Sequence, residues 1–381
     1  MNFDLSPEQM KLKDTIAAFC EREMPPEFGS NIDKTGEFPH ELYQKCAKNG
    51  FFGIPYSAEY GGANGDLVDV IIVTEHLASC SLNVALMYLI PVVFAGMFIL
   101  YSGTDEQKAE ILPKLISGDL KFAFSMSERD AGSDPKSMKT AAVEKDNGFV
   151  VSGVKYWTTG ASVADYLVAI VLTATDGDQG QGMTVFLLPT DSEGVSITPI
   201  PTLALSAYPA CEVVLDNVTI SKENIIGGAT AINKGWDQLR KTGDLERVCV
   251  AACCIGVAET VVKECVAYAR ERHQFKRPIF QFQAIQHTLA DMATDLEAMR
   301  WMTYHAAWMR SQGRNCFKEI SMAKLFCTET LNRIVKRGMQ VFGGKGYSME
   351  HNMQRYLREG YLYLYAGGTS EIQKTVISRF L

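Results

Sequence analysis

The segment Phe149-Val150-Val151-Ser152-Gly153 begins a series of short runs rich in β-branched residues, and this series decides the fold class. The later runs are Tyr166-Leu167-Val168-Ala169-Ile170-Val171, Met183-Thr184-Val185-Phe186-Leu187-Leu188 and Glu212-Val213-Val214-Leu215. Residues that favour turns separate them, at Asp146-Asn147-Gly148, Asp176-Gly177-Asp178 and Glu193-Gly194. The pattern predicts a compact antiparallel β-domain, a small barrel, over residues 121–230.

The sequence on both sides of these runs has a helical period. Apolar residues recur at three- and four-residue spacing in Ser6–Glu23, Pro39–Asn49 and Leu67–Ser79. The period returns after residue 230 and is long enough for a bundle of about four helices. The chain is therefore expected to be an α+β protein with an N-terminal helical domain (1–120), a middle β-domain (121–230) and a C-terminal helical bundle (231–381).

Composition excludes some classes of function. A length of 381 residues allows two or three domains, and 47% hydrophobic with 21% charged residues is typical of a globular protein. A net charge of -7 argues against a nucleic-acid partner, because phosphate binding needs a basic face. Leu82–Leu100 carries no charge and has the length of a membrane span, but Pro91 interrupts it. Two buried helices that meet at Pro91 are predicted instead.

The ten cysteines favour a reducing compartment over a disulfide framework. Cys249, Cys253, Cys254 and Cys265 lie among Val and Ala in a helical stretch, as small buried hydrophobes do. No Cys and His residues recur at the spacing of a zinc site. The N-terminal residues lack a signal-peptide pattern, so a cytoplasmic protein without a metal is expected.

Five segments carry a resemblance to a known family. They are Phe124-Ser125-Met126-Ser127-Glu128-Arg129-Asp130-Ala131-Gly132-Ser133-Asp134, Trp157-Thr158-Thr159-Gly160-Ala161, Arg272–Ile279 with Phe282-Gln283, Gln340–Tyr347 and Leu364–Gln373. Taken singly they have plainer explanations: a polar turn, a core tryptophan, or a basic helix end stopped by Pro278. Taken in this order they resemble the acyl-CoA dehydrogenases, flavoenzymes that desaturate acyl thioesters. The resemblance extends over essentially the whole chain and implies the acyl-CoA dehydrogenase fold.

The resemblance also implies an FAD site. Trp157 would pack against the isoalloxazine, Arg272 would pair with the pyrophosphate, and Gly343 would let backbone amides approach the dinucleotide of a neighbouring subunit. The full set of implied FAD contacts is Phe124, Met126, Ser127, Trp157, Thr159, Arg272, Phe275, Gln283, Gln340, Gly343, Gly344, Thr369 and Glu371. A homotetramer and an electron-transferring flavoprotein as partner are implied with it. The chain departs from the family pattern at Arg129 and Asp130 (usually Pro-x), Lys276 (usually Gly) and Ser206 (usually Arg).

The catalytic base of most family members is missing. Their C-terminal motif carries Glu where this chain has Gly367, which has no side chain to take a proton. Glu246, in Thr242-Gly243-Asp244-Leu245-Glu246-Arg247-Val248, stands where isovaleryl-CoA and long-chain acyl-CoA dehydrogenases carry their acid. Crotonobetainyl-CoA reductases have a similar His-Glu-Arg segment. The plainer alternative for Glu246 is a solvated acid near a helix start, stabilised by the helix dipole.

The resemblance thus implies that Glu246 removes the α-proton while a hydride leaves Cβ for flavin N5. A carboxylate desolvated by substrate has a raised pKa and is a stronger base. The implied substrate contacts are Ser133, Asp244, Arg247, Gly367 and Gly368. Three hypotheses remain open: an acyl-CoA dehydrogenase, an enoyl-CoA reductase on the same scaffold, and a non-catalytic CoA-binding relative. The retained FAD segments argue against the third.

Overall fold

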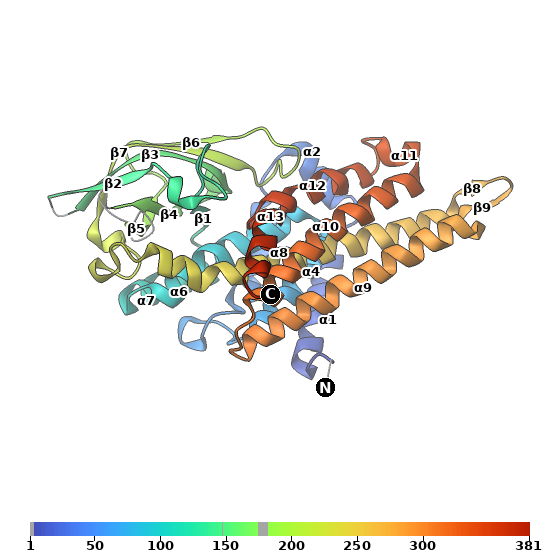
Figure 1. The fold of residues 1–381 in the computed structure, drawn as a ribbon, viewed down its shortest axis with the longest axis horizontal. Coiled ribbons are helices and arrows are strands. Elements are labelled where there is room, and N and C mark those ends of the chain that lie inside the picture. Colours follow the sequence, from blue (N-terminus) through green and yellow to red (C-terminus); the bar gives the residue numbers. More distant parts are fainter. Residues whose placement is uncertain (1–3, 147, 174–181) are drawn as a thin grey trace. The chain divides into compact units, whose positions relative to one another are not determined.

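The computed structural model describes residues 4–146, 148–173 and 182–381, which form two compact units (Figure 1). The helical unit combines the chain up to Thr35 with Asp66–Ala85 and Arg247–Leu381. The sheet unit combines Gly36–Gly65 with Leu86–Glu246. The turn predicted at Asp176-Gly177-Asp178 lies outside the described residues.

The helical unit is built from helices of four to 37 residues. They are α1 (Pro7–Glu23), α2 (Phe28–Thr35), α4 (Leu67–Cys80), α9 (Gln283–Ser311), α10 (Phe317–Phe342), α11 (Gly344–Tyr347), α12 (Met353–Tyr365), α13 (Ser370–Ser378), the start of α5 (Leu82–Leu89) and most of α8 (Gly235–Glu271). Helix α1 begins as predicted because the Ser6 hydroxyl accepts from the Gln9 amide (3.2 Å) while the Gln9 side chain accepts from the Ser6 amide (3.1 Å). The predicted helices Ser6–Glu23 and Leu67–Ser79 are confirmed to within one residue at each end.

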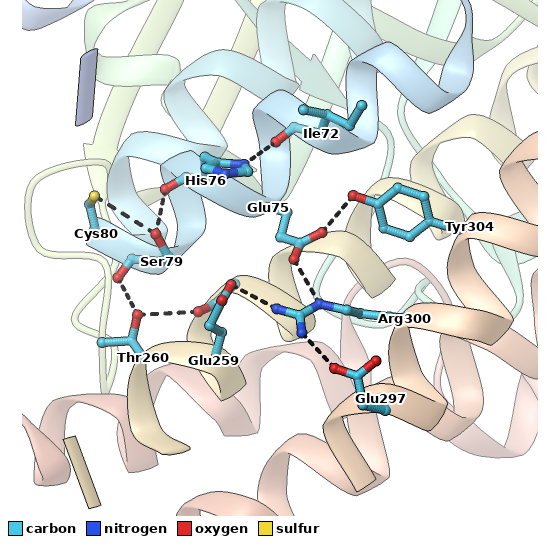
Figure 2. Close-up of polar contacts among 11 residues, drawn as sticks. Ile72, Glu75, His76, Ser79, Cys80, Glu259, Thr260, Glu297, Arg300 and Tyr304 are labelled. Atoms are coloured by element: carbon cyan, nitrogen blue, oxygen red, sulfur yellow. Dashed lines mark hydrogen bonds and ion pairs between the residues drawn. The ribbon is translucent and has the colours of Figure 1, made fainter. Parts of the chain in front are cut away.

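A buried charge network joins α4, α8 and α9 in the helical unit. Figure 2 shows the Glu75 carboxylate between the Arg300 guanidinium (3.2 Å) and the Tyr304 hydroxyl (2.8 Å). Arg300 also pairs with Glu259 and Glu297, at 2.9 Å each. Burial, followed by the neighbouring Glu75, raises the pKa of Tyr304 well above its ordinary value. Because Glu75 is only 4% exposed, these partners compensate a charge that would otherwise be costly to bury.

The sheet unit contains one mixed seven-stranded sheet together with helices α3 (His40–Lys48), α6 (Gly96–Ser102) and α7 (Asp105–Ile116). Its strands are β1 (Phe122–Ser125), β2 (Ala141–Lys145), β3 (Gly148–Thr159), β4 (Tyr166–Leu172), β5 (Met183–Pro189), β6 (Val195–Pro199) and β7 (Ala210–Ser221). The order is β1-β4-β2-β3-β7-β6, with β5 paired to β4.

The helical–β–helical order is confirmed, but the predicted antiparallel barrel needs a correction. Strand β1 pairs with β4 in parallel, from Phe122 opposite Tyr166 to Ser125 opposite Ala169. Within the described residues the ladder starts at β1 and ends at β6 without closing, so the sheet is open and mixed. Every residue of Leu167–Val171 is fully buried, as expected of a strand covered on both faces. A buried run of this kind does not reveal the direction of its partners.

The apolar segment after Ser81 is buried and helical. Helix α5 leads into a π-helical turn (Ile90–Ala95) and then into α6 (Gly96–Ser102), so the helical path continues past Pro91 without the predicted break. Proline cannot donate the usual backbone bond, and a widened turn accommodates it. The Tyr56 hydroxyl donates to the Val92 carbonyl in this turn (2.6 Å). Leu82–Ser102 is long and apolar enough for a membrane span, but 83% of its most apolar window is buried in the protein.

Candidate active site

In the sheet unit, the loop after β1 lies beside the end of β3. The Ser125 and Thr158 hydroxyls are 3.0 Å apart, and the Tyr156 amide donates to the Ser127 carbonyl (2.8 Å). Two segments that are about thirty residues apart in sequence thereby meet. The structure thereby joins Met126 to Lys155 and Ser127 to Tyr156, the residues that precede Trp157 in β3. The FAD contacts assigned to Met126, Ser127, Trp157 and Thr159 stay predictions.

A buried ion pair holds this loop against β3. The Lys155 ammonium, fully buried, donates to Glu128 Oε1 (3.1 Å) and to the Met126 carbonyl (2.8 Å). The Glu128 carboxylate also accepts from the backbone amides of Lys139 (2.7 Å) and Thr140 (2.9 Å). Burial lowers the pKa of Lys155 to about 8, although Glu128 opposes this shift. Burial alone would raise the pKa of Glu128, but its hydrogen bonds and Lys155 hold that pKa below its ordinary value.

Trp157 lies on a β-bulge. Between the pairs Lys155–Val213 and Thr158–Cys211, Tyr156 and Trp157 of β3 face the single residue Glu212 of β7. Trp157 has φ +65°, a left-handed conformation that is rare for an aromatic residue and costs about 1–3 kcal/mol. Its indole is 54% exposed. The backbone therefore displays a large flat side chain that a sequence pattern would assign to the core.

The remaining predicted residues of the sheet unit are more scattered. The Phe124 ring stacks on Phe98, with centroids 5.5 Å apart, and so has a packing role in the apolar interior. Ser133 is exposed in the loop before a short 3-10 turn (Pro135–Ser137). The assignment of Ser133 to the CoA moiety stays a prediction.

Glu246 lies in the interior of α8, about three turns after its first residue. The alternative of an acid near the helix start is therefore wrong. Glu246 is partly buried, and Asp244 is 8% exposed. Residues three apart share one helix face, so Glu246 follows Gly243 on that face. A Cβ placed at Gly243 would meet no described atom within 4 Å, which shows that there is open space beside Gly243.

In the helical unit, Arg272 and Gln283 flank a two-stranded hairpin. Strands β8 (His273–Gln274) and β9 (Arg277–Pro278) pair antiparallel, and Ile279 donates to the Arg272 carbonyl (2.7 Å). The two turn residues, Phe275 and Lys276, both have positive φ (52° and 66°), as in a type I′ turn. Lys276 thus keeps the left-handed turn that a glycine would favour. Phe275 is 87% exposed at the tip, and Arg272 is exposed at the base.

The glycine-rich segment adjoins the base of this hairpin. The Tyr268 ring stacks on Phe342 at 4.2 Å, and the Tyr268 carbonyl accepts from the Arg272 amide (2.8 Å). Gly343 and Gly344 follow Phe342, and a Cβ at either position would meet no described atom within 4 Å. The structure thus places Arg272 and the Gly343–Gly344 backbone on connected elements, with Gln340 exposed in the last turn of α10.

The C-terminal turn is held by buried polar groups. Gly367 and Gly368 have φ +67° and +83°. The fully buried Lys324 donates to the carbonyls of Tyr363 (2.7 Å) and Gly368 (2.6 Å), while Gln373 Nε2 donates to those of Gly367 and Gly368, both at 3.1 Å. The backbone at Gly367 would therefore disfavour the glutamate found in most of the family.

Helix α13 begins directly after this turn. The Thr369 hydroxyl accepts from the Ile372 amide (3.2 Å), so this residue caps the helix. Glu371 is exposed in the first turn. Its backbone hydrogen bond, followed by the Thr369 hydroxyl, lowers its pKa. The cofactor roles assigned to Thr369 and Glu371 stay predictions beside these structural ones.

Sequence reasoning missed three side chains that shape the site: Lys155, Glu128 and Lys324. Lys324 carried a signal, because it occupies a buried position of α10 beside Ile320, Ala323 and Cys327. The sequence signal for Lys155 was weaker: it is a lysine at a position of β3 where the alternation of the strand expects a buried apolar residue. All ten cysteines have free thiols, and Cys249, Cys253, Cys254 and Cys265 are buried as predicted. Within the described ranges no three His, Cys, Asp or Glu side chains are grouped to hold a metal.

Comparisons with known proteins agree with this arrangement. Models described as the N-terminal, middle and C-terminal domains of acyl-CoA dehydrogenase match residues 6–119, 123–218 and 233–381. The chain is 39% identical to 3-(aryl)acrylate reductase of Clostridium sporogenes, covering 97% of this chain and 98% of that protein. It is 37% identical to the caffeyl-CoA reductase–Etf complex subunit CarC of Acetobacterium woodii, covering 98% of each.

A solved structure described as the FAD complex of PigA has a TM-score of 0.93 at 27% identity and covers 100% of this chain and 99% of that chain. The family models together span nearly the full length, and both relatives exceed 30% identity over almost all of it. The chain therefore belongs to the acyl-CoA dehydrogenase family, whose members are oxidoreductases acting on CH–CH groups.

Proposed function

We propose that this protein is an FAD-dependent acyl-CoA dehydrogenase whose base is Glu246. The observation that carries the proposal is that the sequence has an acid at Glu246, one helical turn after the uncrowded Gly243, and none at Gly367. Glu246 would take the α-proton of a bound thioester. The amide hydrogens of Gly367 and Gly368 would meet the charge that develops on its carbonyl oxygen.

The residues present fit FAD. An exposed indole on a fixed bulge suits an isoalloxazine ring, and the uncrowded Gly343–Gly344 backbone suits a dinucleotide. The exposed Arg272 supplies a planar cation for a pyrophosphate. When bound, FAD supplies the acceptor for the two electrons that leave the β-carbon. The FAD complex of PigA supports this cofactor for a chain of the same fold.

A second candidate is an enoyl-CoA reductase that works in the opposite direction. Two relatives with 39% and 37% identity are named as reductases of aryl-substituted acrylic thioesters or acids. One of them is named as a subunit of a complex with Etf, which supports an electron-transferring flavoprotein as the partner in either direction. In the reductase direction, Glu246 would return the proton to the α-carbon.

The test of the base is Glu246→Gln in the FAD-loaded protein. A general base contributes about 10²–10⁴-fold, so substrate-driven flavin bleaching should slow by that factor while FAD content stays constant. Asp237→Asn, an exposed acid on the same helix, is the matched control. A Glu246→Gln variant that bleaches at the wild-type rate would refute the assignment.

The direction is tested with two substrate panels, linear and aryl-substituted. Saturated acyl-CoAs are mixed with the oxidised protein, and the corresponding enoyl-CoAs with the photoreduced protein without oxygen. Faster reoxidation by aryl-propenoyl-CoAs than reduction by any saturated acyl-CoA would favour the reductase. A protein that binds CoA esters but no FAD would indicate a non-catalytic relative. We further propose a cytoplasmic homotetramer, which sedimentation and cell fractionation would test.

A further inference from the structure

We infer that Arg129 is a positioning residue that fixes the Trp157 bulge and thereby the placement of the indole against the flavin. The inference rests on the proposed function for the presence of FAD. It concerns a position where this chain departs from the family pattern, which usually has proline there.

The bulge at Trp157 is a strained feature of β3. Trp157 is held in a left-handed conformation, which needs support from the surrounding structure. Glu212 is the one residue that faces both Tyr156 and Trp157 across the β3–β7 ladder. A side chain that contacts both Glu212 and Tyr156 therefore restrains the backbone of the bulge on both strands.

Arg129 makes both contacts. Its Nε and Nη2 donate to Glu212 Oε2, at 3.1 and 2.6 Å. The guanidinium also lies over the Tyr156 ring, 4.3 Å from its centroid. The Tyr156 ring in turn meets Trp157 edge to face, with centroids 4.9 Å apart at 82°. One side chain thus connects the Ser127 loop, the residue opposite the bulge and the aromatic neighbour of the indole.

This arrangement complements the buried Lys155–Glu128 pair. That pair holds the same loop from the interior, through the residue immediately before Arg129. A proline at this position would restrict the loop by fixing its own φ. Arg129 instead restrains the loop through its contacts with Glu212 and Tyr156. A planar guanidinium can stack on the Tyr156 ring while its edge donates to Glu212, whereas a lysine ammonium is a compact charge that fits the two contacts less well together.

The test compares Arg129→Met, Arg129→Lys, Glu212→Gln and the double variant Arg129→Met/Glu212→Gln in the FAD-loaded protein. The readouts are the visible circular dichroism of the bound flavin and the rate constant of flavin reduction by substrate. Arg129→Met should change the flavin dichroism and slow reduction about tenfold or more, because misplaced reacting groups lose rate steeply. Arg129→Lys should recover part of both, and the double variant should be no worse than either single one.

Lys222→Met is the control. Lys222 pairs with Glu144 at the opposite end of the β3–β7 ladder from Trp157, so both readouts should match wild type. If Arg129→Met has the dichroism and reduction rate of Lys222→Met, the inference is wrong, even if its melting temperature falls. A dichroism change in Arg129→Met, in a protein that turns over no acyl-CoA or enoyl-CoA, would keep the inference and overturn the proposed function. A wild-type protein without FAD would overturn both.

Discussion

Removal of the buried Lys155 ammonium should change how stability depends on pH. The folded protein lowers the pKa of Lys155 from 10.5 to about 8, so between these values the unfolded chain holds more of this proton than the folded one. Burial of the charged ammonium therefore costs stability. This cost is full below about pH 8 and disappears as the pH rises toward 10.5, so stability rises with pH over this range. A tenfold change in proton affinity corresponds to about 1.4 kcal/mol, so the lowering of the pKa from 10.5 to about 8 amounts to roughly 3–4 kcal/mol.

The assay is urea unfolding of wild type and Lys155→Met at pH 7.5, 8.5 and 9.5, followed by tryptophan fluorescence. Comparison with the variant removes the titration of the buried tyrosines and cysteines, which both proteins share. The free energy of unfolding of wild type relative to Lys155→Met should rise by about 2 kcal/mol between pH 7.5 and 9.5. With Lys222→Met, whose lysine side chain is 34% exposed, the difference should stay flat. A flat difference for Lys155→Met as well would refute the account of the buried ammonium.

Three further changes have expected effects on stability, each measured as a shift in urea midpoint. Gly368→Ala should cost about 2–3 kcal/mol, because φ is +83° and the new Cβ would lie 2.7 Å from the side-chain Nε2 of Gln373, which donates to this turn. A neutral result would contradict the left-handed conformation of Gly368. Glu75→Gln should cost about 2 kcal/mol, because it removes the charge of the carboxylate that pairs with Arg300. A loss under about 0.5 kcal/mol would mean that Glu259 and Glu297 alone compensate the charge of Arg300. Lys276→Gly should stabilise the chain by about 0.5–1 kcal/mol through relief of the left-handed turn, and destabilisation would argue against that turn.

The helices and the β-region were predictable because local periodicity specifies them. Ser6 and Gln9 form a capping box that can be read from four residues, and it begins α1 as expected. The direction of strand β1 was not predictable, because its partner β4 lies more than forty residues later and both strands have the composition of a buried strand. The same limit explains why the predicted barrel is an open mixed sheet.

Some residues of the candidate site could be predicted from the sequence, and others could not. Trp157, Arg272 and Gly367 were found through a resemblance of motifs, and the structure gives each a local setting that suits its proposed role. In the sequence, Arg129 was visible only as a departure from the family pattern. Its proposed positioning role depends on a contact with Glu212, which is 83 residues away in sequence. Lys155 and Lys324 were missed because a lysine in a sequence is normally exposed.

The order of helical and β segments, the motifs of the family resemblance and the glycine at position 367 can all be read from the linear chain. They depend on neighbouring residues, on composition or on motif order. The folded chain is needed to see that Trp157 stands on a left-handed bulge, that Lys155 and Glu128 pair in the interior, and that Glu246 lies about three turns into α8. Burial, charge pairing and backbone strain arise from contacts between distant segments, which no local pattern contains.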